Sequence, residues 1–382
     1  MIKSFGVSAS QSITAILIAL SSTLAGGEIS LSAQRFIRES SVLQSDVAMA
    51  QTPPLQSVSF SSVAFQSIPP QETISQATEA QKYLQQGASQ VKQEKYSEAI
   101  QSWETALKLY QEISDRKGEA VTLQAMGLTY IAMRQPQKCT ETLEQSLQIY
   151  EEINNQKGQR AVLEILGGLY YSTQQFPQVA KTYEKLLMIA RDGGDRNLEF
   201  TALETLGIAY SNTGEYRQAI QSLEKAVQTA QQVSNRLLEA EAWRNLGRIQ
   251  SQLGDHKQAL ISYESLLHLK QEAGDSNGQT FALNLIGSVY LEAGEYEKVI
   301  QYKQEALDIA TEVNNPLQQA LAIHDLGIAY VYQSRYEEGR TMLAEALVLA
   351  QQLEHAPLIE QTEKNIQWAE SRYRASNQDQ MV

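Results

Sequence analysis

The stretch "LGIAYSNTGEYRQAI", residues 206–220, contains two pieces that favour helix, with a glycine-containing turn between them. Close copies occur at 286–300, "IGSVYLEAGEYEKVI", and at 326–340, "LGIAYVYQSRYEEGR". One glycine of this pattern recurs every 40 residues, at Gly87, Gly127, Gly167, Gly207, Gly247, Gly287 and Gly327. Seven copies in fixed register, with no insertion or deletion, define an internal repeat of 40 residues.

Other positions of the repeat also keep one kind of side chain. Three residues after the glycine a tyrosine stands in five copies, and Gln90 and Gln250 replace it in the other two. Sixteen residues after the glycine stand mostly large apolar residues: Trp103, Leu143, Tyr183, Leu223, Tyr263, Lys303 and Leu343. Residues that favour helix N-caps also recur every 40 residues: Ser75, Asp115, Asn155, Asp195, Asn235, Asp275 and Asn315.

A single unit reads as a helical hairpin. Phe200, Leu203 and Leu206 follow one another at a spacing of three, which is typical of an amphipathic helix. Gly207 lies inside this helix, where glycine costs about 1 kcal/mol relative to alanine, so we expect a second helix to approach closely there. A lone hairpin cannot bury its apolar stripe, and neighbouring units must stack on one another.

These columns resemble the tetratricopeptide repeat, in which a large residue, Leu-Gly and Tyr mark the first helix, and Ala, an aromatic residue and Ala mark the second. The resemblance covers roughly residues 76–370 and is to the 40-residue variety of kinesin light chain-like proteins and many bacterial arrays. It implies an all-α fold, a right-handed α-solenoid of seven 40-residue helical hairpins plus a C-terminal capping helix. Gln367 stands where the next glycine would fall, as expected of an atypical terminal unit.

The first 33 residues have the form of a secretory signal peptide. One basic residue, Lys3, precedes the apolar run "ITAILIAL" and then small residues. Cleavage after Ala25, Ala33 or, at the latest, Ala50 fits the pattern. The sequence therefore predicts export to the periplasm or cell envelope, or to the thylakoid lumen if the source is photosynthetic. The alternative is a leader with no targeting role, since the n-region is only weakly basic.

The remaining boundaries follow from composition. Residues 34–71 read as an unstructured linker, and 51–71 are rich in Ser, Gln and Pro without any charged residue. We expect the solenoid and its capping helix over 72–375 and a polar tail over 376–382.

Composition excludes several functions. With 31 basic and 44 acidic residues the net charge is −13, which gives no electrostatic basis for binding a nucleic-acid backbone. The apolar run of the leader is too short to span a bilayer, so no integral membrane span is expected in the mature chain. The only cysteine, Cys139, forms no internal disulfide and no CxxC site.

Catalysis has little support in the sequence. His256 occupies a column otherwise filled by aromatic residues or proline, and Cys139 occupies a column of mostly small residues, so both read as packing residues. No catalytic or phosphate-binding motif follows a strand, and no strand is evident. The sequence predicts a protein that is not an enzyme, with no catalytic residues, no cofactor and no metal.

Binding offers a clearer hypothesis, because the resemblance implies that ligands lie along the first helices on the concave side. Positions three and two before the glycine and one after it are predicted to face this groove. The candidate groove residues are Glu164, Glu204, Arg244, Asn245, Arg248, Asn284, His324, Asp325 and Lys364. Arginine grips carboxylates and asparagine bonds to peptide backbone, which favours a protein or peptide partner that is extended and acidic. The alternative is an ordinary solvated inner face, and the pattern does not match the carboxylate clamp of chaperone-binding domains.

Lys303 replaces an apolar residue in a stacking column. It either weakens the joint between the sixth and seventh units as a hinge, or its aliphatic stem, together with Tyr302, fills the space. We favour the second interpretation.

The leading hypothesis is a non-enzymatic, exported scaffold that binds an extended or helical segment of a partner protein, in assembly of an envelope or membrane complex. One alternative is a structural component that self-associates into homo-oligomers. Another is a regulatory sensor of a signalling system, although the array leaves little chain for an effector domain.

Overall fold

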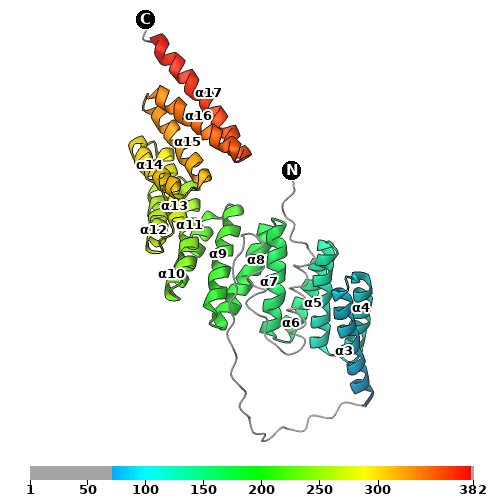
Figure 1. Cartoon of the computed structure of the whole chain (residues 1–382). Coiled ribbons are helices and arrows are strands. Elements are labelled where there is room, and N and C mark those ends of the chain that lie inside the picture. Colours follow the sequence, from blue (N-terminus) through cyan, green and yellow to red (C-terminus); the bar gives the residue numbers. More distant parts are fainter. Residues whose placement is uncertain (1–70, 380–382) are drawn as a thin grey trace. The chain divides into compact units, whose positions relative to one another are not determined.

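Helices make up nearly all of residues 71–379, which are the residues that the computed structural model describes. These residues hold fifteen α-helices in succession and no strand, which confirms an all-α solenoid of consecutive helix pairs (Figure 1). The predicted signal peptide lies outside the described residues, as does the predicted linker apart from Gln71, the first residue of helix α3. The last helix continues to Asp379, four residues beyond the predicted end of the capping helix.

The helices group into two compact units, which meet in the chain between Gln175 and Phe176. The first unit contains α3 (Gln71–Lys92), α4 (Tyr96–Glu112), α5 (Arg116–Ala132), α6 (Pro136–Glu152) and α7 (Gln156–Ser172). The second contains α8 (Phe176–Asp192), α9 (Arg196–Asn212), α10 (Tyr216–Gln232), α11 (Arg236–Gln252), α12 (His256–Glu272), α13 (Ser276–Ala293), α14 (Tyr296–Glu312), α15 (Pro316–Tyr332), α16 (Tyr336–Gln352) and α17 (Ala356–Asp379). Within each unit, consecutive helices pack against one another.

The conserved spacing of glycine and large residue is the contact inside each hairpin. A Cβ atom added at Gly127 of α5 would lie 2.6 Å from Leu143 Cγ on α6. One added at Gly207 of α9 would lie 2.5 Å from Leu223 Cγ on α10. The absent side chain lets the second helix place a bulky residue directly on the backbone of the first, as the sequence predicted.

Side-chain caps begin the first helices, as the column of Asp and Asn predicted. Asp115 Oδ1 accepts a hydrogen bond from the Gly118 backbone N–H at 2.9 Å, and Asn155, Asp195, Asn235, Asp275 and Asn315 cap their helices in the same way. The prediction is wrong for Ser75, because α3 already begins at Gln71. His355 takes the cap position of α17, where its Nδ1 accepts from the Leu358 N–H at 3.2 Å.

Each helix from α3 to α16 is followed by a residue in the left-handed region of the backbone, once every 20 residues from Glu94 to Glu354. Nine of these residues are not glycine, whereas Gly214 and Gly254 are among the five that are. The next N–H then bonds back across the helix end, as Asp115 N does to Tyr110 O at 2.9 Å. This closure ends every helix at the same place and fixes the 40-residue period.

The tyrosine column joins each hairpin to the one before it. Tyr170 on α7 donates its hydroxyl to Glu144 Oε1 on α6 at 2.9 Å, and Tyr210 on α9 donates to Glu184 on α8 at 2.5 Å. Where glutamine replaces tyrosine the bond stays within the hairpin, since Gln250 Oε1 accepts from Ser262 Oγ at 2.6 Å.

Candidate functional site

The predicted groove residues lie on first helices. Glu164 stands on α7 in the first unit, and all the others stand on α9, α11, α13, α15 and α17 of the second unit. Glu164 accepts a bond from Arg160 Nε at 2.9 Å within α7. The structure does not test whether any of these residues binds a partner, so that role stays a prediction.

A buried polar cluster in the second unit contains several of them. Lys303 on α14 is 1% exposed, and its Nζ lies 2.6 Å from Asp325 Oδ2 on α15. The same ammonium donates to the Asn284 carbonyl oxygen at 2.7 Å and to Ser288 Oγ at 3.0 Å, both on α13. His324 is 2% exposed and bonds Asp325 Oδ1 through Nδ1 at 2.8 Å. These contacts tie three successive helices together.

The cluster extends to the last helix through His324. The amide nitrogen of Asn365 on α17 lies 2.9 Å from His324 Nε2. Because that amide group can only donate, Nε2 accepts, and the imidazole proton sits on Nδ1, where it donates to Asp325. The neutral tautomer of His324 therefore satisfies both neighbours.

The charge of Lys303 is balanced where it is buried. Burial by itself raises the pKa of Asp325, but the attraction of Lys303 and the bonds from His324 and Lys303 outweigh it and hold that pKa well below its usual range. The stem of Lys303 covers Gly287, since a Cβ added there would lie 2.6 Å from Lys303 Cε. The lysine thus packs as the leucines and aromatic residues of its column do, which confirms the packing interpretation of this residue.

Asn284, on the same helix, is 6% exposed and fixed by α15. Its Nδ2 donates to Gln318 Oε1 at 2.8 Å and to the Gln318 carbonyl oxygen at 3.3 Å. Both partners are acceptors, so the amide orientation is determined. Its Oδ1 has no hydrogen-bond partner among the described residues and remains able to accept one.

One part of the groove prediction needs correction. Positions three and two before the glycine were expected to face away from the stacking surfaces, but Asn245, Asn284 and His324 are buried. Each bonds to a neighbouring first helix: Asn245 Nδ2 donates to Glu204 Oε1 on α9 at 3.1 Å, 41 residues earlier. The reason is that these two positions lie where adjacent first helices meet.

The groove residues that reach solvent are mostly basic. Arg244 on α11 is exposed, and one turn later Arg248 is half-buried, with a single 3.5 Å bond to Gln252 Oε1. Lys364 on α17 is exposed and paired with Glu360 at 2.7 Å, four residues before it on the same helix. Arg244 and Arg248 are therefore the candidate residues best placed to meet a ligand.

An aromatic stack that sequence reasoning missed lies on the second unit. The Tyr296 and Tyr332 ring centroids are 4.6 Å apart, and those of Tyr332 and Trp368 are 4.9 Å apart. Tyr332 remains 51% exposed. The three residues are spaced 36 apart, and this spacing was the signal available in the sequence.

The residues considered for catalysis have packing roles. Cys139 is fully buried, and burial raises the pKa of its thiol to about 12, so the nucleophilic thiolate is scarce at neutral pH. His256 lies 3.9 Å from Glu292 at the surface. Within residues 71–379 no group of three or more His, Cys, Asp or Glu side chains could hold a metal ion, and no helix is long and apolar enough to cross a membrane.

Comparison with known proteins agrees with this geometry. The sequence profile of the tetratricopeptide repeat family matches residues 78–152, 198–272, 238–312 and 279–352. These matches cover more than half of the chain, which therefore belongs to the tetratricopeptide repeat family. Proteins with this repeat are generally interaction scaffolds without enzymatic activity, and the solenoid is consistent with such a role. No curated protein matches the chain.

Several solved structures share the fold. A signal transduction ATPase with numerous domains from Pyrococcus horikoshii, which carries a tetratricopeptide repeat sensor, is 17% identical with a TM-score of 0.54. The match covers 77% of this chain but only 45% of that one. The quorum sensor NprR from B. thuringiensis is 15% identical over 69% of this chain and 78% of that one, with a TM-score of 0.45. The nearly identical repeats of a kinesin light chain candidate from Podosopora anserina are 18% identical over 53% and 97%, with a TM-score of 0.39.

The buried ion pair gives the first prediction. Lys303→Leu leaves Asp325 without its cation and is expected to lower the free energy of unfolding by about 3 kcal/mol, at the low end for such pairs because His324 and Ser288 still donate to Asp325. Lys303→Leu with Asp325→Leu restores residue types that other repeats carry and is expected to regain most of the loss. Urea denaturation of the three proteins measures this.

The same pair predicts a pH dependence. Because the folded-state pKa of Asp325 is depressed, its stabilisation is complete above the unfolded-state value of about 3.9 and declines as pH falls toward the folded value. The urea midpoint of the wild type should therefore drop more than that of the double variant between pH 5 and pH 2.5, both fixed in advance as about one unit either side of 3.9. Equal drops, or a double variant as unstable as Lys303→Leu alone, would contradict the assignment.

Proposed function

We propose that this protein is an exported, non-enzymatic scaffold that binds an extended acidic segment of a partner protein along the first helices of its second unit. The segment would cross α11, where Arg244 and Arg248 are its main anchors, and continue toward α13 and α15. The scaffold would serve the assembly of a complex in the periplasm or cell envelope. The family and the fold support the scaffold role, and the groove residues support the choice of an acidic partner.

The observation that carries the proposal is the state of two guanidinium groups on one face of α11. Arg244 makes no hydrogen bond or ion pair with any residue in 71–379, and Arg248 contacts only Gln252 Oε1. By contrast, Arg236 at the start of the same helix pairs with Glu239 and Glu272. Residues four apart lie on one side of a helix, and each guanidinium can hold a carboxylate with two parallel bonds. Two such groups suit acidic side chains along one bound segment.

Two buried amides would supply the backbone contacts of the segment. Asn284 presents Oδ1, an acceptor without a partner among the described residues, to which a peptide N–H could donate. Asn245 is held in place by its bond to Glu204 Oε1. Because both amides are fixed by neighbouring helices, little side-chain entropy remains to be lost when a partner binds.

Self-association by stacking of the C-terminal end is the less favoured alternative. The outward surface of α17 is lined by exposed polar residues, among them Glu360, Gln361, Glu363, Lys364 and Gln367. Polar outer faces are typical of repeats that terminate a solenoid and keep it soluble. This end would not stack on a second copy without burying paired charges such as Lys364 and Glu360.

The groove is tested with a fluorescently labelled peptide of alternating Asp, Glu, Gly and Ser. We expect the wild type to bind it, and Arg244→Glu with Arg248→Glu to weaken binding by at least about tenfold, which is roughly 1.4 kcal/mol. Fluorescence anisotropy at several salt concentrations measures both affinities. The matched control is Arg217→Glu with Lys257→Glu, which makes the same charge change on exposed positions of the second helices α10 and α12.

An equal loss of affinity in the control would show that only the net charge matters, and no binding to the wild type would remove the acidic partner from the proposal.

Export is tested on the protein recovered from its native cells. Mass spectrometry of the N-terminal peptide should show a chain that begins after Ala25, Ala33 or Ala50, because a signal peptidase removes the leader behind a small residue. Fractionation of the same cells should place the shortened chain outside the cytoplasm. An intact N-terminus on a chain that remains in the cytoplasm would contradict export.

A further inference from the structure

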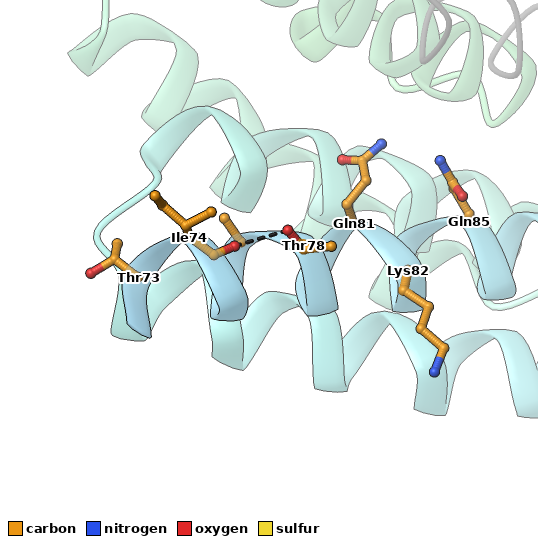
Figure 2. Close-up of a pocket in the computed structure, with 7 residues that line it drawn as sticks. Thr73, Ile74, Thr78, Gln81, Lys82 and Gln85 are labelled. Atoms are coloured by element: carbon orange, nitrogen blue, oxygen red, sulfur yellow. Dashed lines mark hydrogen bonds between the residues drawn. The ribbon is translucent and has the colours of Figure 1, made fainter. Parts of the chain in front are cut away.

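The outward side of α3 carries a shallow hollow of about 630 Å³ that no other described helix lines. Its residues include Thr73, Ile74, Ala77, Thr78, Gln81 and Gln85, and Figure 2 shows Ile74, Gln81 and Gln85 projecting from the same side of the helix. Ile74 is 49% exposed. Thr78 uses its hydroxyl on the Ile74 carbonyl oxygen of the same helix at 2.9 Å.

The equivalent side of every later first helix in the same unit or the next is covered. One repeat after Thr78, Gly118 on α5 faces the ring of Tyr110 on α4, the helix before it. Asn245, Asp325 and Asn365 stand at the position of Gln85, and each bonds to the preceding repeat. The repeat thus reserves this side of a first helix for the hairpin before it, and on α3 no described residue covers it.

Lys82 on this side indicates that the cover is not another repeat. The seven equivalent positions hold only small or β-branched residues, all 0% exposed: Thr122, Val162, Ala202, Ala242, Ala282, Ala322 and Thr362. Lys82 is exposed, and a hairpin stacked there would bury its ammonium group. A narrower occupant can cover Ile74 and Ala77 while Lys82 stays in water at the edge. The end of a second copy, which presents the broad polar face of α17, does not meet this requirement.

We propose that residues 55–68 of this chain fold back along α3 and cap this end of the array. They carry the apolar residues Leu55, Val58, Phe60, Val63, Phe65 and Ile68 within a stretch, 51–71, that has no charged residue. The face of α3 that they cover bears only Lys82 as a charge, and its Thr and Gln side chains can bond to the Ser and Gln of the segment.

The length of the segment suits this role. Its 14 residues, when extended, span about 46 Å, and the 22-residue helix α3 is about 33 Å long, so the segment can cover the face after the chain reverses direction before Gln71. Cleavage after Ala25, Ala33 or Ala50 leaves the segment on the mature chain. The segment is joined directly to the helix that it covers, so its local concentration is high.

Hydrogen exchange with mass spectrometry on the full chain tests the proposal. In the wild type, amides of 55–68 should exchange at least about tenfold more slowly than in an unstructured peptide of the same sequence. Phe60→Ser with Phe65→Ser should remove this protection and speed exchange in the α3 residues that line the hollow. Ile74→Asp, at a half-exposed position that the helix itself does not require, should release 55–68 equally. Met188→Ser, at a 66% exposed position on α8, is the control and should change neither region.

Two results would overturn the proposal. Exchange of 55–68 in the wild type at the rate of the free peptide would show that the segment does not cover α3. Protection of α3 that rises with protein concentration would assign the cover to a second copy. Neither result bears on Arg244 and Arg248, so the proposed peptide groove stands or falls separately.

Discussion

The close contact between a glycine on each first helix and the side chain sixteen residues later determines how the rest of this protein is built. Gly207 places the backbone of α9 against Leu223, and Gly247 does the same for Tyr263 on α12. Because the backbone itself forms the contact surface, the two helices of a hairpin approach at a fixed position along their length. Turns that close every 20 residues then repeat this geometry without drift, and a sequence with a strict 40-residue period becomes an array of similar hairpins.

The same constraint explains why an ionic group can lie in the core between the sixth and seventh hairpins. Lys303 keeps the packing role of its column through its aliphatic stem, and its ammonium then lies where Asp325 and the Asn284 carbonyl can reach it. Through His324 the cluster also holds Asn365 of the last helix. The polar contacts that the groove positions make with each other thus fix the spacing of α13, α15 and α17, and leave Arg244 and Arg248 on α11 as basic groups available to a partner.

Much of the fold could be predicted from the sequence, because the period places equivalent residues in equivalent surroundings. The close approach at Gly207, the caps such as Asp115 and the packing of the Lys303 stem all follow from columns of the repeat. The burial of Asn284 and His324 could not be predicted in this way, since it depends on bonds to residues 34 and 41 positions later, and the partners Gln318 and Asn365 carry no distinctive pattern. Ser75 shows the limit of the argument from columns, since the first helix has no hairpin before it and simply starts earlier.

A double-mutant cycle between Gly207 and Leu223 tests most directly whether this contact governs the hairpin. Gly207→Ala alone should lower the free energy of unfolding by about 1–3 kcal/mol, because the new methyl group would meet Leu223 Cγ in a fully packed site. In a Leu223→Ala background the same substitution should instead raise it by about 1 kcal/mol, because alanine favours helix over glycine and the space is now free. Opposite signs in the two backgrounds are the result that the account predicts. Equal effects of Gly207→Ala in both backgrounds would contradict it.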